Sequence, residues 1–192
     1  MPKFFSRTVM AGLSLVLAAC GQSSISPSAA TPETTGEVQT LSEFPIPTQA
    51  IAIAAPVEDV WAAFTTSEGY QAWASPFAVI DLRVNGTIEA SYADDATVGD
   101  PANIVISILA YLPEQLLVLK TIQAPPDFAS QDVLDRLVSV VEFESLEPNL
   151  TRVTISGVGY TDEDSPMREF FLQANAWSLG QLNAHLTEAA SE

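Results

Sequence analysis

The chain has 192 residues with 24 acidic and 7 basic side chains, one histidine and one cysteine, and its formal net charge is -17. This charge excludes general nucleic-acid binding, because phosphate contacts require clustered lysine and arginine side chains. A single cysteine cannot form a disulfide within the chain or a CxxC motif, and a single histidine excludes zinc sites built from several histidines. The length allows one globular domain with little left over.

Residues 1–19 have the organisation of a secretory signal peptide. Lys3 and Arg7 make its start positive, and residues 9–17 are apolar apart from one glycine and one serine. This apolar run is too short to cross about 30 Å of hydrocarbon as a helix, but it has the length of a signal-peptide core. The small residues that precede Cys20 resemble the bacterial lipobox, in which cleavage leaves an acylated cysteine as the new N-terminus. The alternative interpretation is a buried N-terminal helix with an incidental cysteine.

The resemblance to a lipoprotein implies a location and a partner for the mature protein. Acyl chains on Cys20 would anchor it to a membrane, since each buried methylene contributes about 0.8 kcal/mol to membrane binding. Gly21, rather than an aspartate, follows the cysteine, and in the lipoprotein pattern this resembles proteins sent to the periplasmic face of the outer membrane. We therefore expect a lipid-anchored protein of the bacterial cell envelope, with the inner membrane as the alternative location.

Residues 20–47 are expected to form the lipidated cysteine and a flexible tether. The segment 21–40 is rich in serine, threonine, proline, glycine and alanine and has few bulky side chains, so it cannot bury enough apolar surface to offset the entropy of ordering. A flexible coil of about twenty residues has an r.m.s. span of roughly 25 Å. The tether would hold the folded domain, predicted at residues 48–192, close to the membrane surface.

The domain is predicted to begin with one strand and two helices. Ile51 and Ile53 alternate with alanine in a short strand at residues 50–54. Pro56 then begins a helix. Proline is favoured in the first turn, because the backbone N–H that it lacks would have no partner there within the helix. Apolar residues recur at helical spacing after this proline, and a second short helix is expected at residues 68–73.

After the second helix the hydrophobic period changes from helical to two. The pair Asn85-Gly86 predicts a type I′ hairpin, in which both central residues need a positive φ. Ser165 is expected to cap a long C-terminal helix. The strands are predicted at residues 80–84, 88–92, 104–110, 116–122, 138–145 and 152–159. The long helix is predicted at residues 165–187.

This α+β order and four local motifs resemble the helix-grip fold of the SRPBCC (START-like) superfamily, closest to its branch related to activators of the Hsp90 ATPase. Residues 55–65 resemble that branch's proline-led helix with an internal Val-Trp pair, and residues 82–86 after Trp73 resemble its first hairpin. Residues 108–117 resemble its central hairpin, and residues 150–153 resemble the start of its last strand. The resemblance implies a curved antiparallel sheet of about seven strands, as counted along this sequence, wrapped around the long C-terminal helix.

Such folds often leave an apolar cavity between the sheet and the helix, and residue periodicity predicts which side chains face it. Alternation along the first hairpin places one set of side chains on the inner face: Ile80, Leu82, Val84, Ile88, Ala90 and Tyr92. On the later strands the same alternation places Val141, Phe143, Val153 and Ile155 on this face. Steps of about 100° along the long helix place Met167, Phe170, Phe171, Ala174, Trp177, Ser178, Gln181 and His185 together, with Leu172, Leu179 and Leu186 near the opposite side. The predicted ligand-pocket residues are Trp73, Tyr92, Tyr111, Phe143, Trp177, Ser178, Gln181 and His185.

Two interpretations of these pocket residues are open. Ser178, Gln181 and His185 could be convergent hydrogen-bonding groups in a mostly apolar pocket. Alternatively, the aromatic residues pack as ordinary core, and His185 is exposed near a helix C-terminus, where it suits the helix dipole.

Motifs for catalysis, cofactors and metals are missing from the sequence. It contains no GxSxG nucleophile elbow, no GxxxxGK phosphate loop and no GxGxxG turn, so no catalytic residue and no cofactor is predicted. Two acidic clusters, Asp94-Asp95 with Asp100 and residues 162–164, lack the ligand spacing of a calcium loop. We expect both clusters to be solvated loops, and no metal site is predicted.

The predicted function is binding of a small apolar molecule or a lipid by a domain anchored in the cell envelope through Cys20. One alternative is a cyclase- or hydrolase-type enzyme that uses His185 or a tyrosine in the same cavity. Another is a protein-interaction module with a degenerate cavity. The scarcity of catalytic groups favours binding over catalysis.

Overall fold

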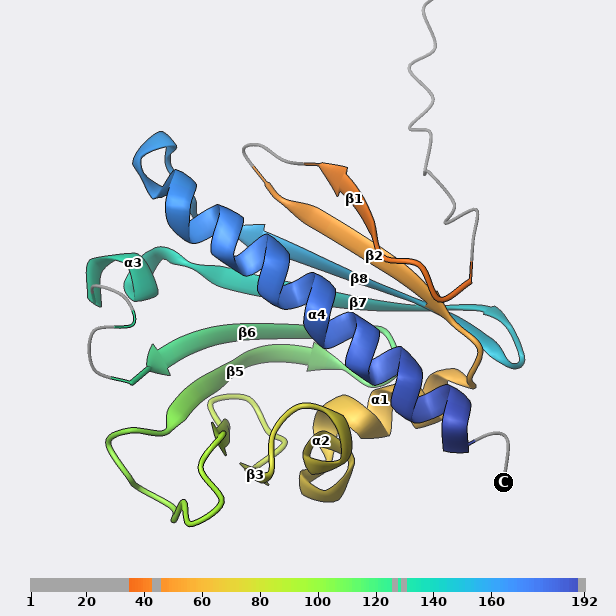
Figure 1. Cartoon of the computed structure of the whole chain (residues 1–192), viewed down its shortest axis with the longest axis horizontal. Helices are drawn as coiled ribbons and strands as arrows, with labels where there is room; N and C mark the ends of the chain where they lie inside the picture. Colours follow the sequence, from red (N-terminus) through yellow and green to blue (C-terminus); the bar gives the residue numbers. More distant parts are fainter. Residues whose placement is uncertain (1–34, 43–45, 126–127, 129–130, 190–192) are drawn as a thin grey trace, which may run out of the picture.

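The computed structural model describes residues 35–42, 46–125, 128 and 131–189. The predicted signal peptide, the lipidation site Cys20 and most of the predicted tether lie outside the described residues. The fold is α+β, with one antiparallel sheet and a long C-terminal helix that lies across one face of it (Figure 1). Among the described helices, none combines the length and the apolar composition needed to cross a membrane.

The sheet has eight strands, one more than the sequence analysis predicted, in the order β1-β2-β8-β7-β6-β5-β4-β3. The last strand, β8, therefore lies beside β2, and β3 forms the opposite edge of the sheet. The strands are β1 (Gln39–Ser42), β2 (Thr48–Ile53), β3 (Phe77–Ile80), β4 (Thr87–Ser91), β5 (Ile104–Leu112), β6 (Leu116–Gln123), β7 (Val138–Glu147) and β8 (Leu150–Val158). The helices are α1 (Val57–Thr65), α2 (Ser67–Trp73), α3 (Gln131–Arg136), the 3-10 helix η1 (Asp162–Asp164) and α4 (Ser165–Ala189).

Local sequence explains the two short helices that follow β2, both of which the sequence analysis predicted. Pro56 has an extended backbone and directly precedes α1, whose first turn carries two acidic residues that suit the helix dipole. Val60 and Phe64 bury one face of α1. Thr66 caps α2, because its hydroxyl accepts a 3.0 Å hydrogen bond from the backbone N–H of Gly69.

The first hairpin differs from its prediction. The strand expected at residues 80–84 lies earlier, at β3, and a longer loop replaces the two-residue turn, with a positive φ of 62° at Asn85 but not at Gly86. The cause lies outside the hairpin, in β5. The Asn85 N–H donates to the Ile108 carbonyl at 2.8 Å, and the Ile108 N–H donates to the Gly86 carbonyl at 2.9 Å. This pairing holds the loop open and leaves Val84, predicted inward, 52% exposed.

Two elements have no counterpart in the sequence analysis. β1 lies within the segment assigned to the tether and pairs with β2 through Gln39 and Ala50. Its sequence QTLS has no apolar alternation, so the free edge of β2, rather than a local pattern, makes it a strand. The second element is α3, a six-residue helix with Leu134 buried. The sheet therefore extends to the N-terminal side of residue 48.

The helix α4 begins at an ion pair instead of the predicted serine cap. The backbone N–H and the hydroxyl of Thr161 donate to the Asp164 carboxylate at 2.7 and 2.8 Å. Arg136, at the end of α3, donates to both carboxylate oxygens at 2.9 and 3.0 Å, and this guanidinium holds the pKa of Asp164 well below its usual range. Asp164 is therefore buried and paired, not part of a solvated loop, and Ser165 is the first residue of α4.

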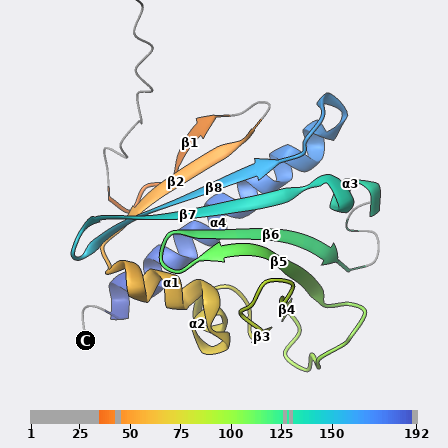
Figure 2. The ribbon, with the colours of Figure 1, turned by 180° about the vertical axis from the view of Figure 1, so that it is seen from behind.

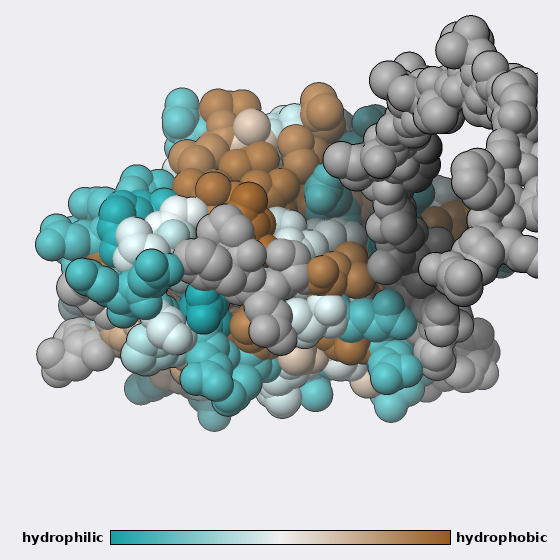
Figure 3. Space-filling view, turned by 90° about the horizontal axis from the view of Figure 1, so that it is seen from above, coloured by the Kyte–Doolittle hydropathy of each residue, from teal (hydrophilic) through white to brown (hydrophobic). Residues whose placement is uncertain are grey.

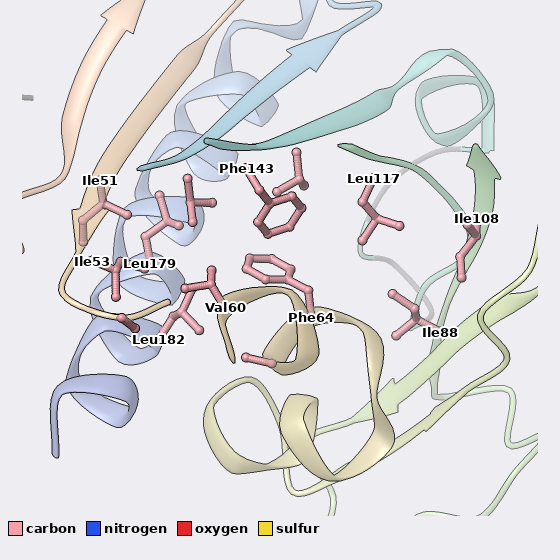
Figure 4. Packing of buried hydrophobic residues seen from close by; sticks show 14 residues of the cluster. Ile51, Ile53, Val60, Phe64, Ile88, Ile108, Leu117, Phe143, Leu179 and Leu182 are labelled. Carbon is pink, nitrogen blue, oxygen red and sulfur yellow. The ribbon is translucent and has the colours of Figure 1, made fainter. Parts of the chain in front are cut away.

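The main core lies between the sheet, α1 and the C-terminal half of α4 (Figure 4). Ile51 from β2 and both Leu179 and Leu182 from α4 are completely buried. The ring of Phe143 meets Phe64 of α1 edge-on, with the centroids 5.2 Å apart. The strand alternation predicted this inner face correctly at Ile88, Ala90, Val141, Phe143 and Val153.

The C-terminal half of α4 buries a different face from the predicted one. Leu179, predicted near the opposite side, belongs to the core, whereas Trp177, predicted inward, is 55% exposed. In the N-terminal half the predicted face does point to the sheet, because a cavity there is lined by Phe170, Phe171, Ala174 and Ser178. Apolar and aromatic residues occur all round this helix, so periodicity alone does not select the buried face.

The buried face of the C-terminal half of α4 can be tested by comparing two truncations. We expect Leu182→Ala to lower the free energy of unfolding by about 2–5 kcal/mol, because it leaves a cavity in the core. Trp177→Ala removes a larger side chain, but we expect a loss below about 1 kcal/mol, because much of the indole is already in water. Urea unfolding measures both changes. A larger loss for Trp177→Ala would mean that α4 faces the sheet as the sequence analysis predicted.

Asp164→Asn is expected to remove a stabilisation that depends on pH. The folded pKa of Asp164 is lowered from its ordinary value of 3.8, so its contribution is fully present above about pH 5 and is lost as the pH falls below about 4. The difference in melting temperature between the native chain and the variant should be wide at neutral pH and narrow towards pH ~2. Asp162→Asn, at an exposed neighbour in η1, is the matched control for calorimetry. A difference that stays constant with pH would contradict this role.

Candidate functional site

A cavity of about 250 Å³ lies between the sheet and the N-terminal half of α4. Its walls come from α2, from the ends of β4, β5 and β6, and from α4, so segments far apart in the sequence meet there. The burial of Leu179 and Leu182 holds the C-terminal half of α4 against the core, and the cavity lies beneath the other half. The residues that line it include Tyr70, Trp73, Ala90, Tyr92, Ile104, Ile106, Phe128, Phe170, Phe171, Ala174, Asn175 and Ser178.

Three phenylalanines form the wall of the cavity near the start of α4. Phe128 meets Phe170 and Phe171 edge-on, with ring centroids 5.5 and 6.2 Å apart. The rings of Phe170 and Phe171 are themselves 5.6 Å apart. Ile104 and Ile106 of β5 contribute to the sheet side of the cavity. A ligand would therefore meet mostly apolar surface.

Five polar side chains in the cavity lining have no hydrogen-bond partner among the described residues: Tyr70, Tyr92, Thr121, Asn175 and Ser178. The indole N–H of Trp73 is different, because it donates to the Ala63 carbonyl at 2.9 Å. A hydroxyl or amide group without a partner beside apolar walls can orient a ligand that carries its own donor or acceptor. The cavity therefore combines apolar walls with a few unused hydrogen-bonding groups.

No carboxylate, imidazole, ammonium or guanidinium group is found among the described residues that line the cavity. Tyr70 and Tyr92 are its titratable groups, and burial, with a smaller contribution from Tyr92, raises the pKa of Tyr70 to about 12. Tyr70 stays protonated at neutral pH, where it can donate a hydrogen bond but cannot act as a base. A charged ligand would be buried without a counter-ion, so the cavity suits an uncharged one.

The structure brings only three of the eight predicted pocket residues together in the cavity. Trp73, Tyr92 and Ser178 line it, and Tyr92, at 66% exposed, lies at its rim. Tyr111 and Phe143 instead belong to a packed aromatic group around Trp61, with ring centroids 6.4 and 5.3 Å from the Trp61 ring. These two residues have the ordinary core role that the sequence analysis left open.

The cavity does not include Trp177, Gln181 or His185, because the C-terminal half of α4 turns Leu179 and Leu182 to the core instead. Trp177 and Gln181 are exposed, and neither lines the cavity. His185 lines a separate and more open groove of about 580 Å³, near Asp59 at the start of α1. Two helical turns, or about 10 Å along the helix axis, separate His185 from Ser178. His185 therefore cannot act as a general base on a ligand in the cavity.

Neither acidic cluster forms a metal site in the part of the chain that the structure describes. Within this part, no three side chains of the metal-binding types come together. Asp94 and Asp95 are exposed, whereas Asp164 is occupied by Arg136. The hydrogen-bonding groups of the cavity are hydroxyls and an amide, which favour an organic ligand over an ion.

Two cavity residues have signals in the sequence that the analysis did not use. Asn175 lies four residues after Phe171 and three before Ser178, both on the predicted helix face, and this spacing places all three beside the cavity. Tyr70 lies three residues before Trp73 on α2, which places both rings on the same side of that helix. Phe128 has no comparable signal, because only the tertiary fold brings it to Phe170 and Phe171.

Residues 54–186 match the model of a protein family described as "Activator of Hsp90 ATPase homolog 1-like protein". The matched region begins directly after β2 and ends near the end of α4, so it includes every element that lines the cavity. No curated protein matches the chain in sequence.

Solved structures with the same fold come from several bacteria. A protein from Rhodobacter sphaeroides has a TM-score of 0.60 at 16% identity, over 81% of this chain and 100% of that chain. The protein SSP2350 from Staphylococcus saprophyticus has a TM-score of 0.57 at 17% identity, over 74% of this chain and 91% of that chain. The Aha1 dimer from Colwellia psychrerythraea has a TM-score of 0.54 at 18% identity, over 72% and 93% respectively. At these identities the likeness concerns the fold alone.

Proposed function

Because the chain belongs to the family of activator of Hsp90 ATPase homolog 1-like proteins, we propose that its helix-grip domain binds a small uncharged organic molecule between the sheet and α4. A fold shared by many proteins does not define a function, so the proposal rests on the cavity. The observation that carries it is the combination of apolar walls, no ionic group, and five polar side chains without partners among the described residues. Such a site favours binding of a mostly apolar ligand that carries one hydrogen-bond donor or acceptor.

The size of the cavity narrows the class of ligand. Its volume of about 250 Å³ lies just below the usual range of about 300–1,000 Å³ for ligand pockets. A cavity of this size favours a compact ligand, such as a single-ring alcohol, over a diacyl lipid.

Binding is favoured over catalysis because the cavity lacks a group that could move a proton at neutral pH. The phenol of Tyr70 stays protonated, and His185 lies in the other groove. A cyclase- or hydrolase-type reaction needs a positioned acid or base within hydrogen-bond reach of its substrate. The hydroxyls and the amide of the lining can orient a ligand but do not supply this function.

We also propose that acyl chains on Cys20 hold the domain at the membrane of the bacterial cell envelope, on the periplasmic face of the outer membrane. The support is the order of features in the sequence: a positive start, a short apolar run, small residues and then the cysteine. Acylation would place the cavity within one tether length of the membrane, where apolar small molecules concentrate.

Ligand binding is tested with Trp73 as the reporter, because its ring lines the cavity. Trp61 and Trp177 are replaced by phenylalanine, and 4-methylcyclohexanol is titrated while Trp73 emission is recorded. We expect a saturable change in emission and, at about 100 times the dissociation constant, a stabilisation of about 2.7 kcal/mol in thermal unfolding. The anion 4-methylcyclohexanecarboxylate is the matched charged probe and should bind at least tenfold more weakly. Equal binding of the two probes would contradict an uncharged site.

Filling the cavity is expected to abolish binding. Ala174 lines the cavity, whereas Ala184 lies on the same helix and is exposed, so Ala174→Trp and Ala184→Trp form a matched pair. Ala174→Trp should bind 4-methylcyclohexanol at least tenfold more weakly, at a packing cost of about 1–3 kcal/mol. Ala184→Trp should bind normally. A folded Ala174→Trp variant with unchanged affinity would place the ligand elsewhere.

The proposed anchor is tested independently of the ligand. Cys20→Ser removes the thiol that acylation requires, so we expect no incorporation of a fatty-acid analogue and an uncleaved precursor. Metabolic labelling followed by a denaturing gel measures both outcomes. Equal labelling of the Ser variant and the native chain would show that Cys20 is not the site of acylation.

A further inference from the structure

The outer face of the sheet, which points away from α4, has an apolar surface of its own. Side chains alternate along a strand, so the neighbours of the buried residues Leu117 and Val141 point to this outer face. Seen from behind, the middle of β6, β7 and β8 has no described helix in front of it (Figure 2). We define the outer apolar surface by six of its residues: Leu112, Leu116, Val118, Val138, Val140 and Val158.

This surface is unusual for the face of a sheet that meets water. A sheet that is covered on one side normally alternates apolar residues inside with polar residues outside. Here Leu112 is 53% exposed and Val158 is 40% exposed. Hydrophobic residues gather at the side of the molecule that lies behind in Figure 1, as the view from above shows (Figure 3). A contiguous apolar patch on a folded domain marks an interaction site.

The strand register arranges the surface in rows that run across the strands. Ala110 pairs with Val118, Val118 pairs with Val140, and Val140 pairs with Ser156, so small residues form a central row. Leu112, Leu116 and Glu142 form the row on one side of it. Lys120, Val138 and Val158 lie on the other side, two residues beyond the central row on their strands.

Two charged residues flank the central row on opposite sides. Glu142 is the register partner of Leu116, whereas Lys120 lies two residues beyond Val118 in the opposite direction along β6. Neither Lys120 nor Glu142 has an ion-pair partner among the described residues. One acid and one base, equally displaced from a central apolar row, make the surface complementary to itself.

We propose that a second copy of this chain covers the outer apolar surface, in a symmetric dimer whose twofold axis runs across the strands over Val118 and Val140. Rotation about this axis exchanges the two flanking rows, so Lys120 of each copy lies beside Glu142 of the other. A symmetric interface must bring residue i to residue j and j to i, and this surface satisfies that condition. The central row has small side chains, which lets the two sheets approach to the usual distance of about 10 Å.

The apolar rows and the charged pair have different roles in this dimer. Removal of the valine and leucine side chains from water supplies the favourable free energy of association. The two reciprocal pairs of Lys120 and Glu142 determine the register of the two sheets, because a shifted arrangement leaves both charges without partners. The dimer is independent of the ligand cavity, which lies on the opposite face of the sheet.

The dimer is tested by thiol crosslinking of the full chain in bacterial membranes. Val140→Cys places a thiol over the proposed axis, so a short bismaleimide should join two copies into a band of twice the monomer mass. Trp177→Cys, at an exposed position on α4, is the matched control and should give no such band. The native chain, whose single cysteine is Cys20, gives the background.

Charge reversal tests the proposed register in the Val140→Cys background. Lys120→Glu or Glu142→Lys alone places like charges together across the axis, and we expect each to lower the crosslinked fraction roughly fivefold or more. The double variant restores opposite charges and should return the fraction to the Val140→Cys level. Thermal unfolding of each variant separates a loss of dimer from a loss of fold.

Three results would overturn the dimer. If Val140→Cys reacts rapidly with a monofunctional maleimide but forms no crosslink, the surface is open to water. If it neither reacts nor crosslinks, something other than a second copy covers the surface. If crosslinking occurs but the double reversal does not restore what the single reversals lose, the two copies meet in another register.

Discussion

Leu179 and Leu182 of α4 are buried against β2 and α1, and this contact fixes where the long helix lies on the sheet. Each leucine that is fully buried contributes about 1.5–3 kcal/mol relative to an exposed one, and both are fully buried. They hold the C-terminal half of a 25-residue helix. The start of the same helix is held by Arg136 and Asp164. The cavity lies beneath the part of α4 between these two attachments.

Small residues in the lining leave the cavity unfilled. Ala90 on β4 and Ala174 on α4 both line it, and neither fills the space as a leucine would. The polar groups of Tyr70, Asn175 and Ser178 have no partner within the described fold, so they are available to hydrogen-bond a ligand. Incomplete packing and unused polar groups in one place are what distinguish a binding site from a core.

The two faces of the sheet differ in what covers them. The inner face is covered by α1 and α4, and its residues Val141, Phe143 and Val153 are buried. The outer face carries valine and leucine from β5 to β8 without a described helix over its middle. Apolar residues on both faces are expected of strands that are covered on both sides, so the composition of these strands itself argues for a second covering surface.

Local patterns in the sequence predicted seven of the eight strands, the helices α1, α2 and α4 and their order, which is that of the α+β helix-grip fold, although β3 lies earlier than expected. It also placed Val141, Phe143 and Val153 on the inner face, because alternation is a local property of a strand. β1, in contrast, is a strand because it pairs with the free edge of β2, which no local pattern indicates. The buried face of the C-terminal half of α4 likewise depends on tertiary packing, because apolar residues occur all round that helix. The cavity is the space that remains when distant segments pack, and no local pattern encodes such a space.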